Sequence, residues 1–247
     1  MDWTDGTQFA LAALGFFLAG VLKGATGLGY SSCALPFLVS ALGLKTAIAM
    51  LVIPAMLSNV LLLINTGHFG ETLRRFWPLY AAMLPGIVVG TTLLVWIDQR
   101  IATRVLGILT VVYAVFALAR PTLGLAEGRS RALRVPVGLV NGIFTGLTGS
   151  QMMPLLPYML ALRLDTDRFV QANNVAVTLA SAFLATALLV SGLMTWPILG
   201  LSIAAVVPAL VGVDLGTRAR RLIPASSFRV IVIVLLLVMG LVLAARP

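Results

Sequence analysis

One kind of segment occurs twice in this chain: an apolar stretch that is interrupted by glycines and small polar residues and that ends in proline. The first copy runs from Gly20 to Pro36 and the second from Gly138 to Pro154. Both lie within hydrophobic sequence, where an opened backbone is tolerated only if it is buried in protein or lines a cavity. The two copies therefore predict a pair of interrupted helices around a transport site.

Composition places these breaks in a membrane. Hydrophobic residues make up 60% of the 247 residues and charged residues only 10%, which is more apolar surface than a water-soluble domain can bury. Several apolar runs approach the roughly 20 residues that a helix needs to cross a bilayer. The runs lie at 8–23, 30–43, 46–66, 76–97, 102–119, 135–145, 150–162, 169–190, 197–217 and 228–245. We expect an all-α integral membrane protein.

The apolar runs also divide into two sets of five, which predicts an internal repeat. Residues 1–120 form the first transmembrane repeat, 121–134 a polar cytoplasmic linker, and 135–247 the second repeat. Trp77-Pro78 recurs as Trp196-Pro197, and such parallels keep one order, with offsets between 118 and 125 residues. A common order of matches favours a repeat over coincidence.

The distribution of lysine and arginine distinguishes two topologies. If each interrupted pair enters and returns, twelve basic residues lie on one face and four on the other; if each pair crosses once, the split is nine against seven. The first count fits the positive-inside rule better and puts both termini in the periplasm. The four are Lys45, Arg100, Arg104 and Arg246, and the twelve are Arg74, Arg75, Arg120, Arg129, Arg131, Arg134, Arg163, Arg168, Arg218, Arg220, Arg221 and Arg229.

This topology makes the two halves begin on opposite sides of the membrane. They are then inverted repeats, each a Gly-interrupted returning helix pair plus three transmembrane helices. Re-entrant hairpins and short full crossings both satisfy the charge count. In either form the two breaks face one another near the midplane, where secondary transporters bind their substrates.

A helix break exposes backbone N–H groups at the start of the resumed helix, and these groups favour an oxyanion. The candidate substrate-binding residues are Lys23, Thr26, Gly27, Gly29, Ser31 and Ser32 in the first copy, Asn141, Thr145, Gly146, Thr148, Gly149, Ser150 and Gln151 in the second, and Asn173 and Asn174 in a later span. The alternative is that the glycines serve only close helix packing. Asn59 is a weaker candidate, since buried asparagines commonly join helices.

Lys23 is a formal charge well inside an apolar segment. An intramembrane charge costs about 3 kcal/mol on insertion scales, so it needs a partner or a function. One interpretation is contact with an anion, with Asn141 as its counterpart in the second copy supplying an amide donor. The other is that Lys23 extends to the interface or pairs with a carbonyl.

Other functional classes find little support in the sequence. One cysteine and one histidine exclude an internal disulfide and provide no metal-ligand set, and no phosphate-binding loop for ATP is present. We expect no enzyme activity, no metal and no cofactor. The net charge of +9 lies in short connections, so it indicates membrane orientation rather than nucleic-acid binding. Asp214 and Arg218 are spaced for an ion pair at the end of a span.

Residues 19–36 and 142–154, with Tyr158 and Arg168, resemble the two signatures of the TauE/SafE sulfite exporter family, also called the 4-toluene sulfonate uptake permeases. The similarity covers nearly the whole chain. It implies a bacterial inner-membrane transporter of sulfur oxyanions or organosulfonates. The family's glycine-rich breaks correspond to Gly24, Gly27, Gly29, Gly142, Gly146 and Gly149. The chain departs from the commoner motifs at Tyr30-Ser31-Ser32 and at 150–153.

These observations predict a secondary transporter that moves sulfite, thiosulfate or an organosulfonate by alternating access around a site between the breaks. Its expected partners are the small anion, the lipid bilayer and a coupling ion, H⁺ or Na⁺; the sequence does not specify an oligomeric state. A passive anion channel and a non-transporting membrane accessory subunit are the alternatives.

Overall fold

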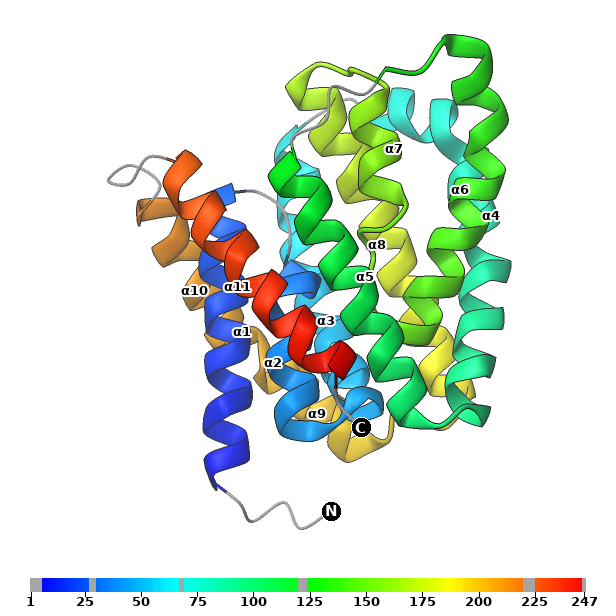
Figure 1. Ribbon diagram of the computed structural model, residues 1–247. Coiled ribbons are helices and arrows are strands. Elements are labelled where there is room, and N and C mark those ends of the chain that lie inside the picture. Colours follow the sequence, from blue (N-terminus) through cyan, green and yellow to red (C-terminus); the bar gives the residue numbers. More distant parts are fainter. Residues whose placement is uncertain (1–5, 27–29, 67–68, 120–123, 220–224, 246–247) are drawn as a thin grey trace.

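The structure is a computed structural model that describes residues 6–26, 30–66, 69–119, 124–219 and 225–245 (Figure 1). The described residues contain helices and no strand, as the sequence predicts. The helices are α1 (Gly6–Thr26), α2 (Tyr30–Leu42), α3 (Leu44–Thr66), α4 (Phe69–Trp96), α5 (Gln99–Ala119), α6 (Glu127–Thr148), α7 (Leu155–Ala161), α8 (Thr166–Val190), α9 (Trp196–Ala204), α10 (Val206–Ala219) and α11 (Ala225–Ala245).

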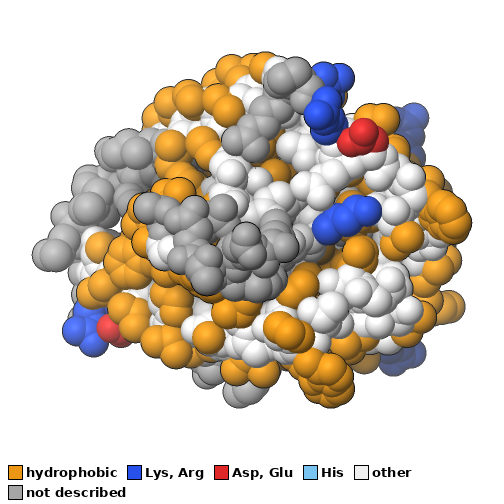
Figure 2. All heavy atoms as spheres, turned by 90° about the horizontal axis from the view of Figure 1, so that it is seen from below, with side chains coloured by type: hydrophobic (Ala, Val, Ile, Leu, Met, Phe, Trp, Pro, Cys, Tyr) orange, Lys and Arg blue, Asp and Glu red, His pale blue; other side chains and the backbone are white. Residues whose placement is uncertain are grey.

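The outer surface of this bundle is apolar. Large hydrophobic side chains are exposed on many helices, and those of Trp96, Val190 and Trp196 are each 85% exposed. Figure 2 shows hydrophobic side chains around most of the rim when the bundle is viewed along its helices. Among the described residues, four segments are long and apolar enough to span a bilayer: Phe69–Trp96, Gln99–Ala119, Asp167–Val190 and Trp196–Ala219. The chain is a multi-pass membrane protein, with lipid as the solvent of this surface.

The two halves of the chain start at opposite ends of the bundle. In Figure 1, α1 begins at the lower end, where α3 and α5 also begin, whereas α4, α6 and α8 begin at the upper end. The described basic residues separate accordingly. Lys45 and Arg100 lie in the first turns of α3 and α5 at the lower end. The N-terminal parts of α4 and α6 bring Arg74, Arg75, Arg131 and Arg134 together around a cavity of about 760 Å³ at the upper end. The cytoplasmic assignment of the upper end stays a prediction.

The interrupted pairs differ in form. α1 has 21 residues and α6 has 22, each long enough to cross, but α2 has 13 and α7 only 7. The second break also lies later than the sequence predicts. α6 continues through Gly146 and ends at Thr148, because Gly149 takes a left-handed conformation, φ 73°, that favours glycine. Residues 149–154 then connect α6 to α7. At its other end α6 begins at Glu127, inside the stretch expected to be a linker.

Two helix pairs pack through facing glycines, α1 against α10 and α4 against α6. A methyl group added at Gly20 would overlap the backbone around Gly212, and one at Gly142 would overlap the backbone around Gly86. One turn further along, the neighbours are Val213 and Thr217 for Gly24, and Ile87 and Thr91 for Gly146. Each first helix thus packs on the fourth span of the opposite half, and the halves interlock.

This packing sets the register between the two copies. Gly20 corresponds to Gly142 and Gly24 to Gly146, so Lys23 corresponds to Thr145. The expected pairing of Lys23 with Asn141 was therefore wrong. The reason is that the second copy has four fewer residues between its glycines and its proline, which shifts any alignment made on the prolines. The glycines on these faces serve helix packing, as the alternative interpretation held.

Candidate functional site

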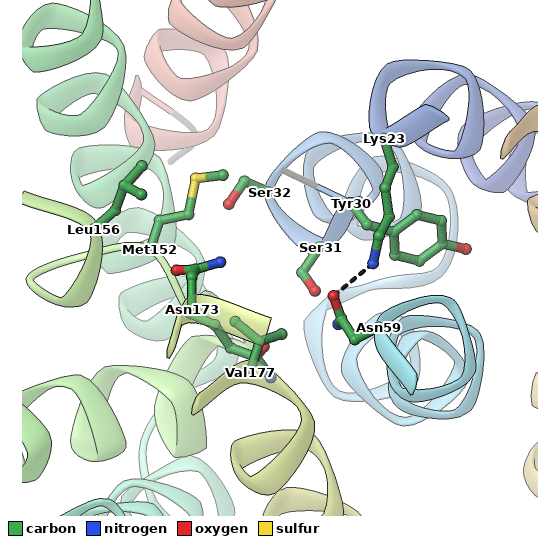
Figure 3. A pocket seen from close by; sticks show the side chains of 10 residues that line it. Lys23, Tyr30, Ser31, Ser32, Asn59, Met152, Leu156, Asn173 and Val177 are labelled. Atoms are coloured by element: carbon green, nitrogen blue, oxygen red, sulfur yellow. Dashed lines mark hydrogen bonds between the residues drawn. The ribbon is translucent and has the colours of Figure 1, made fainter. Parts of the chain in front are cut away.

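A small polar cavity lies between the two interrupted segments (Figure 3). Its volume is about 40 Å³, above the roughly 10–15 Å³ that one water needs. The lining residues are Lys23 of α1, Tyr30, Ser31 and Ser32 of α2, Asn59 of α3, Gln151 and Met152 of the second break, Leu156 of α7, and Asn173 and Val177 of α8. Both halves of the chain therefore contribute to one site.

Lys23 provides the charge in this cavity. Lys23 is 3% exposed, and its Nζ donates hydrogen bonds to Asn59 Oδ1 at 2.5 Å and to Ser58 Oγ at 3.0 Å. The Tyr30 ring lies with its centroid 5.9 Å from Nζ. Because Gly20 and Gly24 turn one face of α1 toward α10, Lys23 lies on the adjoining face, toward α3. The residue does not extend to the interface.

The partners of Lys23 are fixed as acceptors. Asn59 Nδ2 donates to the carbonyl of Ala55 at 2.8 Å, and Ser58 Oγ donates to the same carbonyl at 2.9 Å. With their donors used in this way, both side chains present oxygen lone pairs to Nζ. These two neutral acceptors hold the amine in place without neutralising its charge.

The first turn of α2 forms a second polar wall. Tyr30, Ser31 and Ser32 begin the helix, and the backbone N–H groups of a first turn have no partners within their own helix. The hydroxyl of Ser32 is buried without a hydrogen-bond partner. The positive end of the helix dipole therefore adds to the charge of Lys23. In Figure 3, Ser31 lies between Lys23 and Asn173.

The second half supplies a neutral wall. Gln151 donates from Nε2 to Ser181 Oγ at 3.0 Å, and its Oε1 is buried without a partner. Figure 3 places Met152 and Asn173 across the cavity from Lys23. Met152, Leu156 and Val177 make this side largely apolar. No carboxylate lines the cavity among the residues that the structure describes.

Five of the predicted site residues meet here: Lys23, Ser31, Ser32, Gln151 and Asn173. Gly27, Gly29 and the Thr26 side chain lie outside the described residues. The remaining predicted residues, which do not line the cavity, are Asn141, Thr145, Gly146, Thr148, Gly149, Ser150 and Asn174.

Several of these other residues shape the second break. Thr148 Oγ1 donates to the carbonyl of Phe144 at 2.7 Å and accepts from Ser150 N at 3.2 Å, and Thr145 Oγ1 donates to the carbonyl of Ser150 at 3.3 Å. These bonds fold the chain back at the end of α6. Asn141 is buried with no partner for either amide atom, and Asn174 Nδ2 donates to the carbonyl of Val170 at 2.9 Å.

Sequence reasoning missed Tyr30, Ser58, Met152, Leu156 and Val177, and ranked Asn59 too low. Ser58-Asn59 is a polar pair inside an apolar helix, which is a usable signal. Its meaning depends on the Lys23 side chain of α1 reaching α3, and periodicity alone does not predict that contact.

Charged groups outside the cavity form surface ion pairs. Arg218 binds Asp214 at 2.8 Å, as the sequence predicts, with both side chains exposed. Arg168 binds Glu71 of α4 at 3.0 Å and Asp165 at 2.7 Å, joining the starts of α4 and α8. In the described part of the chain, no group of three His, Cys, Asp or Glu residues could hold a metal ion.

Comparison with known proteins gives one match. A family model described as "Sulfite exporter TauE/SafE" matches residues 11–243. No curated protein and no solved structure matches the chain. The matched region includes both interrupted segments and every residue that lines the cavity.

Proposed function

The chain belongs to the sulfite exporter TauE/SafE family of membrane transporters, and from this premise we propose that it is a secondary transporter of a small sulfur-containing anion. Sulfite, thiosulfate and short organosulfonates are the candidate substrates. The observation that carries the proposal is Lys23, a buried amine that faces a cavity built from both interrupted segments and bonds only to neutral acceptors.

Charge favours an anion in this cavity. A buried ammonium with neutral partners lacks the counter-charge that usually offsets its desolvation. An oxyanion beside Nζ would supply this charge and would accept hydrogen bonds from the Ser31 and Ser32 hydroxyls and the first N–H groups of α2.

The size and the second wall of the cavity favour a compact anion with one apolar side. A volume of about 40 Å³ suits a small ion better than an aromatic sulfonate. A sulfur oxyanion directs its oxygens to donors and leaves the sulfur lone pair, the terminal sulfur or a methyl group to be covered. Met152, Leu156 and Val177 provide such an apolar cover.

The two walls belong to different halves of the chain, which suits alternating access in which the halves move relative to one another about the site. In this proposal the protein lies in the inner membrane with both termini periplasmic, and the cluster of arginines faces the cytoplasm. Coupling to H⁺ or Na⁺ would drive net movement.

Counterflow in proteoliposomes tests the function. Vesicles are loaded with unlabelled sulfite and placed in labelled sulfite under anaerobic conditions, with thiosulfate and methanesulfonate assayed in parallel. A carrier accumulates label transiently because internal substrate accelerates its return. A passive channel shows uptake without this stimulation, and an accessory subunit shows no uptake with any of the three anions.

The two lysines of the chain provide a matched pair of variants. Lys23→Met is expected to lower counterflow at least tenfold. Lys45→Met changes the other lysine, at the start of α3 and outside the cavity, and is expected to transport at the wild-type rate. Equal rates for both variants would remove Lys23 from the site.

A further inference from the structure

We propose that Lys23 carries one proton across the membrane with each anion, cycling between ammonium and neutral amine. The inference rests on the proposed anion transport and adds its coupling ion. Its basis is the hydrogen bonding around Nζ. Two of the three hydrogen-bonding positions of Nζ meet acceptors that either protonation state can use, and the third faces the cavity.

The first step is a count of donors and acceptors. An ammonium has three N–H donors, whereas a neutral amine has two donors and one lone pair. Two positions around Nζ meet the lone pairs of Asn59 Oδ1 and Ser58 Oγ, whose own donors are bound to the carbonyl of Ala55. Either form of Lys23 can make these two bonds. The third position alone distinguishes the forms.

The second step concerns that third position. When an oxyanion occupies the cavity, the third N–H of the ammonium donates to it and the two charges compensate. When the cavity is empty, the same N–H has no acceptor that the described contacts provide, and the ammonium is a buried charge without a counter-ion. Such a group favours its neutral form. Anion binding and proton binding therefore support one another.

The surroundings of Lys23 hold no fixed counter-charge among the described residues. On α2, the titratable groups are the Tyr30 phenol and the buried Cys33 thiol, both uncharged when protonated. On α10, Asp214 and Arg218 are exposed and paired with each other. On α3, Ser58 and Asn59 are neutral, as are Gln151 and Asn173 across the cavity. The charge of Lys23 is thus left for the substrate to balance.

The transport cycle conserves charge and protons. On one side the amine takes up a proton and an anion, giving an ammonium–anion pair; on the other side both leave, and the neutral amine returns empty. One proton and one anion move in the same direction in each cycle. Exchange of anion for anion needs no proton release, because the ammonium stays charged throughout.

This difference between exchange and net transport provides the test. Lys23→Arg keeps a permanent positive charge that cannot lose its proton. Wild type and Lys23→Arg are assayed for sulfite counterflow and for net uptake into sulfite-free vesicles, with the membrane potential clamped by potassium and valinomycin. The external pH is held constant, so the form of sulfite outside does not change, and the internal pH is raised to direct the proton gradient inward.

We expect Lys23→Arg to lower net uptake at least tenfold more than it lowers counterflow, so that the ratio of net uptake to counterflow falls at least tenfold below that of the wild type. Net uptake by Lys23→Arg at the same fraction of wild type as its counterflow would overturn the proton role and leave the transport function standing. No counterflow by the wild type would overturn the transport function itself.

If Lys23→Arg does not fold or does not exchange, measurements on the wild type alone test the proposal. Net uptake that rises at least tenfold with the inward proton gradient, while counterflow stays constant, supports the proposal. A net rate that is the same with and without the gradient overturns it.

Discussion

The two interrupted segments share one packing arrangement but differ in chemistry. Each presents two glycines, one turn apart, to a glycine-bearing helix of the opposite half. At the matched position, however, the first segment has Lys23 and the second has Thr145. Lys23 reaches across to α3, whereas Thr145 bonds within its own break. The scaffold is duplicated and the charge is not.

This difference indicates how an anion would be oriented. The first half contributes the amine and the first turn of α2, and the second contributes the amides of Gln151 and Asn173 beside apolar side chains. A substrate between them would direct its oxygens to the first half and its apolar side to the second. The predictions below change matched positions in the two halves.

Moving the charge to the second half has the largest expected effect. Thr145 is fully buried, and its side-chain Oγ1 donates to the carbonyl of Ser150. Thr145→Lys would bury a charge without the paired acceptors of Lys23, at a cost of about 3 kcal/mol. Lys23→Thr removes a buried charge and should unfold near the wild-type temperature while losing transport. Thermal unfolding in detergent measures both. A wild-type unfolding temperature for Thr145→Lys would show that the second half also accommodates a charge.

Replacing matched glycines of the two halves by alanine should lower the stability of the protein by nearly equal amounts. A methyl group at Gly24 or Gly146 would press on the backbone of the facing helix, which cannot rotate away as a side chain can. Gly24→Ala and Gly146→Ala should each lower stability by about 1–3 kcal/mol, the usual range for overpacking. Gly200→Ala in α9, where nothing lies within 4 Å, is the control and should not lower stability; it should raise it by up to about 1 kcal/mol, because alanine is the better helix former. A large effect from only one of the two would contradict the matched packing.

The sequence predicts most of the architecture because hydrophobic length and glycine breaks are local signals. It anticipates the apolar helices, the two interrupted segments and the convergence of Lys23, Ser31, Ser32, Gln151 and Asn173. Register is harder to predict, since the first copy has four more residues between its glycines and its proline: Pro36 lies inside α2, whereas Pro154 precedes α7. Gly146 was therefore placed in the break, although its helix continues for two more residues.

Partners across helices are also poorly predicted. The bonds from Lys23 to Ser58 and Asn59 join residues 35 and 36 positions apart, and they depend on the rotation of α3 about its axis. The length of α7 is also poorly predicted. Seven helical residues follow a connection with no helical period, so an apolar run at 150–162 looked like one segment.

A pair of asparagines tests whether Lys23 needs its acceptor. Asn59 and Asn174 each donate from Nδ2 to the carbonyl four residues earlier, but only Asn59 also accepts from Lys23. Asn59→Leu should lower sulfite counterflow about tenfold, equivalent to about 1.4 kcal/mol. Asn174→Leu removes a buried oxygen without a partner and should preserve stability and transport. A matched loss in both variants would instead bring Asn174 into the substrate site, as the sequence predicts.

The smallest effect is expected at the starts of α3 and α8, which occupy equivalent places in the two halves. Asp165 precedes α8 and accepts from Arg168 N at 2.9 Å and from the Arg168 guanidinium at 2.7 Å, whereas the equivalent residue at the start of α3 is Lys45. The hydrogen bond from the Arg168 backbone and the one from its side chain hold the pKa of Asp165 below its ordinary value.

Because the folded pKa of Asp165 is depressed, its contribution to stability is present above the ordinary aspartate pKa and is lost as the pH falls through the lower folded value. Acidification should therefore speed amide hydrogen exchange in the first turn of α8 and leave the first turn of α3 unchanged. The effect is small because Asp165 is exposed and screened by salt. Asp165→Asn can still cap the helix but cannot titrate, so it should flatten this pH dependence. An equal acid response at both helix starts would mean that this difference between the halves has no energetic consequence.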